Sequence, residues 1–171
     1  MSHRGPVLDH LDLAKARHTT NVATSAHDRM LSLHRYFLAA STMKAAYERR
    51  AAEYGIALNP DHFDWNQQWV YLSLWYATLF VVAEEWVSDQ TLRDDEVDAL
   101  LKTENLDLLR RFRNGVFHFQ SRYYDPRLTD FVAAGAGSAA WIRQLHSSLG
   151  RSILARLSQS QANLGKPTRL G

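Results

Sequence analysis

Cysteine is absent from all 171 residues of the chain. Without a thiol, the protein has no disulfide framework, no thiolate zinc site and no cysteine nucleophile. Eight histidines remain, and none belongs to an H-E-x-x-H motif. His27 and His34 are seven residues apart with no carboxylate at ligand spacing, which makes a weak metal pair. We therefore expect neither a metal nor a cofactor.

Long hydrophobic runs are also missing. The longest uncharged apolar stretch, residues 69–83, is shorter than the roughly 20 residues that span a bilayer, and Ser73 and Thr78 interrupt it. The stretch predicts a buried core helix. The N-terminus leads into no apolar segment of the kind that a secretory signal contains. We expect a cytoplasmic protein that does not associate with membranes.

Strand-like alternation, internal repeats and low-complexity segments are lacking as well, and the patterns that exist are helical. Between residues 25 and 55, apolar side chains recur in steps of three and four, with Lys44 as the one polar member. Ser25 is a suitable cap for this helix, and Gly55 with Asn59-Pro60 ends it. The stripe consists of Met30, Leu33, Phe37, Ala40, Tyr47, Ala51 and Tyr54.

A second helix is predicted over residues 61–88. Apolar residues also lie off its main stripe, which indicates a central helix that is contacted on several sides. That stripe comprises Trp65, Trp69, Leu72, Tyr76, Leu79, Val82 and Trp86. A third helical region begins near Asp94, bends or breaks near Thr103, and continues through Phe119.

Asp125-Pro126 is a capping residue followed by a first-turn proline, which predicts a short helix that Gly135-Ala136-Gly137 ends. The last helix is predicted over residues 138–160, with Ile142, Leu145, Leu149, Ile153 and Leu157 on one face. Residues 1–25 predict an arm or a short helix, and residues 161–171 a tail. The expected fold is one all-α domain over residues 1–171, an antiparallel bundle of four or five helices.

The basic residues are strongly biased toward arginine, with 16 arginines against 4 lysines, while the net charge is only +2. The planar guanidinium matches the geometry of phosphate, so the bias is compatible with a nucleic-acid ligand. A GC-rich genome explains it equally well, and the bias alone decides nothing.

The sequence of chemical interest is Arg113-Asn114-Gly115-Val116-Phe117-His118. An arginine and a histidine at this spacing are not specific, because Arg29 and His34 are spaced identically. What distinguishes the later pair is its context: Asn114 follows the arginine, and an apolar helix leads into the motif. Histidine titrates near neutral pH and suits either proton transfer of RNA cleavage, and arginine binds phosphate with two hydrogen bonds.

On the predicted helix, Asn114 and His118 share a face, so Asn114 can orient the imidazole. Arg113 lies about 140° away from His118 around the helix axis, which favours a composite site formed by two chains. Gly115 costs a helix roughly 1 kcal/mol relative to alanine. Close approach of a partner chain or of RNA would explain its presence, and so would a helix bend.

The motif and the apolar helix before it resemble the R-x(4-6)-H motif of the HEPN superfamily. The resemblance implies a small α-helical bundle and a metal-independent ribonuclease of toxin–antitoxin or antiviral systems. It further implies RNA as substrate, a homodimer that pairs two motifs, and an antitoxin or nucleotidyltransferase-type partner. Family toxins with such a partner often carry tyrosine two residues after the histidine, where this chain has Gln120, so that subclass is disfavoured.

Residues around the motif are candidates for supporting roles. Some family members place an acidic or polar residue near the arginine, and Glu84 or Glu85 is the candidate here. Tyr123 and Tyr124 are candidates for stacking on bases. Arg110, Arg111 and Arg122 are candidates for contacts to the RNA backbone.

Each of these residues also has a structural interpretation. A histidine between two phenylalanines is often a hydrogen-bonded core or boundary residue, and clustered arginines are often a solvated face. Two further functions therefore stay open beside the endoribonuclease: a catalytically silent HEPN module that binds a nucleotide or a protein, and a helical interaction or scaffold protein.

Overall fold

The computed structural model describes residues 26–55 and 63–164, which contain six helices and no strand. The helices are α2 (Ala26–Tyr54), α3 (Phe63–Ser88), α4 (Asp95–Leu101), α5 (Asn105–Phe117), α6 (Pro126–Ala133) and α7 (Ala136–Leu164). The expected all-α class is confirmed, but the described residues contain six helices and not four or five, because the third helical region consists of two helices, α4 and α5. The predictions for residues 1–25, for Asn59-Pro60 and Asp61, and for the last seven residues lie outside the described ranges.

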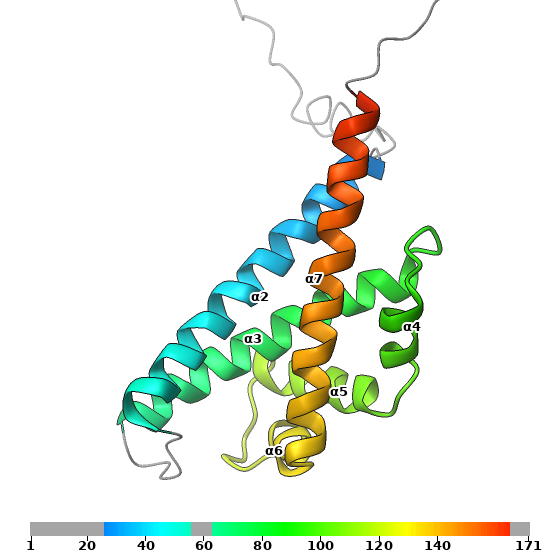
Figure 1. Cartoon of the computed structure of the whole chain (residues 1–171). Coiled ribbons are helices and arrows are strands. Elements are labelled where there is room, and N and C mark those ends of the chain that lie inside the picture. Colours follow the sequence, from blue (N-terminus) through cyan, green and yellow to red (C-terminus); the bar gives the residue numbers. More distant parts are fainter. Residues whose placement is uncertain (1–25, 56–62, 165–171) are drawn as a thin grey trace, which may run out of the picture.

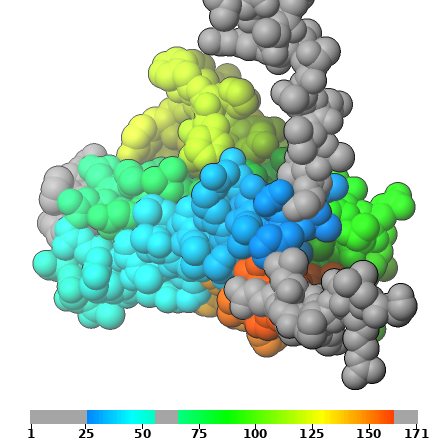
Figure 2. Space-filling model, turned by 90° about the horizontal axis from the view of Figure 1, so that it is seen from above, coloured from blue at the N-terminus to red at the C-terminus, as the bar shows by residue number. Residues whose placement is uncertain are grey.

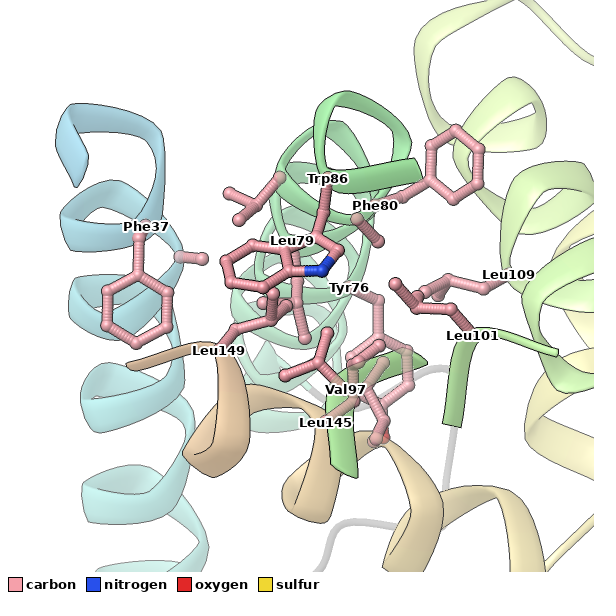
Figure 3. Close-up of a cluster of buried hydrophobic side chains, with 14 of the residues drawn as sticks. Phe37, Tyr76, Leu79, Phe80, Trp86, Val97, Leu101, Leu109, Leu145 and Leu149 are labelled. Carbon is pink, nitrogen blue, oxygen red and sulfur yellow. The ribbon is translucent and has the colours of Figure 1, made fainter. Parts of the chain in front are cut away.

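Helix α3 is the centre of the fold. Figure 1 shows α2 and α3 as a long antiparallel pair, with α7 lying across it and α4, α5 and α6 completing the other side. Trp75, Leu79, Val82 and Trp86 of α3 are fully or almost fully buried. Figure 3 shows how side chains from α2, α4, α5 and α7 converge on Leu79 and Trp86 of this helix. The prediction of a central helix contacted on several sides is confirmed.

The stretch Asn66–Ser88 is long and apolar enough to cross a membrane by length and composition, with a mean hydropathy of 1.2 over its best window. Half of that window is buried inside the fold, as expected of the core helix of a bundle. On α7, all five residues of the predicted stripe are buried: Ile142, Leu145, Leu149, Ile153 and Leu157.

The short helices begin as their sequences predict. Asp94 caps α4 by accepting hydrogen bonds from the backbone N–H groups of Glu96 and Val97, both at 3.1 Å. Asp125 caps α6 in the same way, and Pro126 occupies the first turn. Gly55 and Gly135 have positive φ angles of 74° and 73° at the ends of α2 and α6, where a residue without Cβ is favoured.

Three predicted boundaries are wrong. Helix α5 ends at Phe117 and does not continue through Phe119. The Gln120 side chain donates to the Gly115 carbonyl, which the Phe119 N–H would bond in a continuing helix. Helix α7 starts at Ala136, so Gly137 lies inside it, and it runs to Leu164, beyond the predicted end at residue 160.

A polar network lies at the crossing of α2, α3 and α7. Trp75 Nε1 donates to Nδ1 of the buried His146 at 3.0 Å, which leaves the imidazole Nε2–H to donate to Ser41 Oγ at 3.1 Å. Burial lowers the pKa of His146 to about 4, assisted by the charge of Lys44 and opposed by Glu48. A neutral imidazole is therefore part of the native core.

Candidate active site

Arg113 lies near the end of α5 and is held by three neighbours. Its Nη2 donates to Glu84 Oε2 of α3 at 3.2 Å, and its Nη1 donates to Asn114 Oδ1 at 3.0 Å. The guanidinium carbon lies 5.5 Å from the centre of the Phe80 ring. The side chain remains 29% exposed. Arg113 is thus fixed in direction while part of it faces solvent.

The expected contact between Asn114 and His118 is wrong. The Asn114 side chain accepts from Arg113, and only the backbone carbonyl of Asn114 accepts from the His118 N–H, at 3.1 Å. The reason is the early end of α5, because His118 has extended backbone angles (φ −118°, ψ 137°) and lies outside the helix. The 140° offset between Arg113 and His118 therefore does not apply to this structure.

His118 is exposed, which excludes the interpretation of this residue as a core histidine. It lines a groove of about 660 Å³ between the end of α5, the following segment and α6, with Asn66 and Trp69 of α3 forming one wall. Figure 2 shows this part of the chain, in yellow-green, projecting from the body of the molecule. Arg113 does not line the groove. One chain therefore does not place its arginine and its histidine in the same cavity.

Aromatic side chains surround the groove and leave much of their surface open. Phe119 is 95% exposed, and Tyr123 and Tyr124 are each 64% exposed. The two tyrosine rings pack edge to face with centroids 4.8 Å apart. The candidate base-stacking residues Tyr123 and Tyr124 are thus accessible.

Gly115 is explained by its own chain. A Cβ at this position would lie 2.8 Å from Leu128 Cδ2 and 3.1 Å from Arg127 Cβ, both on α6. The close approach is therefore made by α6 and not by a partner chain or by RNA. The glycine lets α5 and α6 pack tightly, and this packing shapes one side of the groove.

The three arginines that are candidates for contacts to the RNA backbone differ in their ion pairs. Arg110 pairs with Asp107 at 2.8 Å, and Arg111 pairs with Asp130 at 2.9 Å. Arg122 lines the groove and forms no ion pair within the described part of the chain.

The two acidic candidates are divided between two arginines. Glu84 contacts Arg113, as described above. Glu85 instead pairs with Arg29 of α2 at 2.9 Å. Of the two glutamates, the structure therefore brings only Glu84 to the candidate site.

No group of three or more potential metal ligands is brought together in the part of the chain that the structure describes. His27 Nδ1 lies 2.9 Å from Ser160 Oγ, so this histidine bridges α2 and α7. The groups at the motif are a guanidinium, an amide, an imidazole and the carboxylate of Glu84, and this one carboxylate is paired with Arg113.

Asn66, Trp69 and Leu128 belong to the groove and were missed from the sequence. Trp69 was assigned to the apolar stripe of its helix, and nothing in the local sequence separates a groove wall from a core position. The one available signal was the run of aromatic residues from Phe117 to Tyr124.

Comparison with known proteins adds no relative: no family model, no curated protein and no solved structure matches the chain.

Proposed function

We propose that the chain is a metal-independent endoribonuclease of the HEPN type, with Arg113 and His118 as its catalytic pair. The observation that carries the proposal is the fixed orientation of the Arg113 side chain and the exposure of the His118 side chain. Arg113 is fixed by Glu84 and Asn114 beside an open surface, and His118 is exposed on the rim of the groove of about 660 Å³.

The proposed chemistry is attack by the 2′-hydroxyl of RNA on its own 3′-phosphate. The O2′–P bond forms, the P–O5′ bond breaks, and the products carry a 2′,3′-cyclic phosphate and a 5′-hydroxyl. His118 accepts the proton of the 2′-hydroxyl or donates one to the leaving O5′. Arg113 stabilises the charge that develops on the phosphorane, the role that a metal ion has in other nucleases.

The environment of Arg113 suits this role. A guanidinium has five N–H donors in a rigid fork, and Glu84 and Asn114 engage two of them. Donors therefore remain for a phosphate, and the ones already used set the direction of the fork. Asn114 and Glu84 act as positioning residues in this proposal.

Because Arg113 does not line the groove of its own chain, the complete site is proposed to form from two chains in a homodimer. We further propose a cytoplasmic protein that acts in toxin–antitoxin or antiviral defence, with an antitoxin as a further partner.

One observation favours a second candidate, the catalytically silent HEPN module. Arg110 and Arg111 form ion pairs with carboxylates of their own chain, so the surface around the motif offers RNA little unpaired positive charge. Exposed ion pairs of this kind are weak, at about 0–1 kcal/mol, and a phosphate can replace the carboxylate.

The test is cleavage of a single-stranded RNA by the purified full chain in excess EDTA, with DNA of the same sequence as the parallel substrate. We expect cut RNA with cyclic-phosphate ends and intact DNA. His118→Ala should lower the rate by about 10² to 10⁴-fold. Arg113→Lys should also impair cleavage, because a point charge lacks the bidentate fork.

The chain provides its own control, since Arg29 and His34 have the same spacing outside the site. His34→Ala should leave cleavage unchanged. Activity that EDTA abolishes and magnesium restores, equal cutting of DNA, or full activity in the His118→Ala protein would each overturn the proposal.

A further inference from the structure

One surface of the molecule combines a hollow with protruding apolar side chains. Around the groove, the exposed large hydrophobic residues are Phe117, Phe119, Tyr123, Tyr124 and Val132. A contiguous apolar surface of this kind marks a place where another molecule binds. Phe119 is the extreme case, since it follows α5 outside any helix and is 95% exposed.

The charges around the groove distinguish between possible occupants. Arg111 pairs with Asp130, and Arg127 pairs with Asp125 at 3.0 Å, so these two positive charges are neutralised within the chain and only that of Arg122 is left at the groove. A polyanion such as RNA draws its affinity from uncompensated positive charge, and Arg122 alone supplies little. Two identical surfaces that carry a large net charge of one sign repel each other, and the low net charge around this groove avoids that repulsion.

We propose that the occupant of this groove is a second copy of the chain, and that Phe119 of each copy inserts into the groove of the other. In a two-fold dimer the same patch meets itself, so it must supply both a protrusion and a hollow. This surface supplies both, with Phe119 as the protrusion and a groove whose walls include Trp69, Val116 and Leu128. An aromatic side chain seated in an apolar pocket is the usual centre of a stable interface.

The inference deepens the proposed function by naming how the two chains of its site meet. Each dimer buries two Phe119 rings at contacts that involve the segments carrying both His118 residues. The proposed active site is then complete only in the dimer, and cleavage at low protein concentration should rise with the square of that concentration.

The first experiment measures association of the full chain without RNA. Sedimentation velocity should show a dimer at tens of micromolar for the wild type. Phe119→Ser should raise the dissociation constant by about 10² to 10⁴-fold, since both rings are lost together. Leu154→Ser is the matched control, because Leu154 is similarly apolar and 54% exposed but lies on α7 outside the groove. It should leave the dimer unchanged.

The absence of cysteine permits a second, direct test of the contact. Mixing Phe119→Cys with Val132→Cys should give a disulfide-linked heterodimer under mild oxidation. Mixing Phe119→Cys with Leu154→Cys should give none. The Phe119 variants should keep the circular dichroism of the wild type, because the ring is exposed in the single chain.

A wild-type monomer at these concentrations, or a dimer that Phe119→Ser leaves intact, would overturn the inference, as would crosslinking through residue 154. A stable dimer without ribonuclease activity would reject the proposed function and leave this contact standing. A monomer that cleaves RNA would reject this contact and the site formed from two chains, and would leave the ribonuclease activity and its chemistry standing.

Discussion

The buried imidazole of His146 predicts a specific loss of stability in acid. Its pKa is about 4 in the native chain against 6.5 for the unperturbed side chain. Between these values the unfolded chain binds a proton that the native chain does not, so stability falls as the pH is lowered. The contribution of the neutral imidazole to the free energy of unfolding is fully present above about pH 6.5 and is lost progressively down to about pH 4. Each unit of difference corresponds to about 1.36 kcal/mol, which gives about 3 kcal/mol between pH 7 and pH 4.

The assay is urea unfolding of the wild type and of His146→Gln over this pH range. Glutamine retains an acceptor for Trp75 and a donor for Ser41 but does not titrate, so its curve should lack this pH dependence. The carboxylates of the protein titrate in both proteins and cancel in the difference. The dependence of the free energy of unfolding on urea is about 1–3 kcal/mol per molar. Between pH 7 and pH 4, the urea concentration at the unfolding midpoint should therefore fall by about 1–3 M more for the wild type than for the variant.

Ile153→Val is the control for a general loss of core stability. Ile153 is fully buried on α7, and removing one methyl group should lower stability by about 0.5–1.5 kcal/mol at every pH alike. If His146→Gln retains the wild-type pH dependence, the imidazole does not stay neutral in the native core, and the reasoning is refuted.

Three further predictions concern stability. Gly115→Ala should lower the melting temperature, because the clash with α6 costs about 1–3 kcal/mol and exceeds the helix propensity gain of about 1 kcal/mol; an unchanged or raised value would contradict the packing described above. Asp94→Ala should cost about 1–2 kcal/mol in chemical unfolding through loss of the α4 cap, whereas Asp95→Ala should change stability by less than about 0.5 kcal/mol. Arg113→Ala and His118→Ala should each cost less than about 1 kcal/mol by calorimetry, and a larger loss at His118 would indicate a structural role.

Helix positions were largely predictable because their signals are local. Asp125 before Pro126 fixes the start of α6, and the spacing of Ile142 through Leu157 identifies the buried face of α7. The end of α5 was not predictable in this way. There, a glutamine side chain competes for the Gly115 carbonyl, and the outcome of such a competition depends on the path of the chain beyond the helix.

The candidate site shows the same division between local and tertiary information. The sequence identifies Arg113 and His118 by spacing and context. It cannot choose between Glu84 and Glu85, because successive helix positions point about 100° apart and the choice depends on where α2 and α5 lie. Glu84 faces Arg113 and Glu85 faces Arg29. The structural reason for Gly115 was likewise not predictable, because the helix that packs against it, α6, begins about a dozen residues later in the sequence.

The position of Trp69 has a consequence for spectroscopy. This indole forms one wall of the groove and packs edge to face on Phe112 at 6.0 Å, while Trp75, Trp86 and Trp141 are buried. Anything that fills the groove therefore replaces water beside Trp69 and leaves the surroundings of the three buried indoles unchanged. A shift of tryptophan emission to shorter wavelength that disappears in Trp69→Phe would report occupancy of the groove without any label attached to the protein.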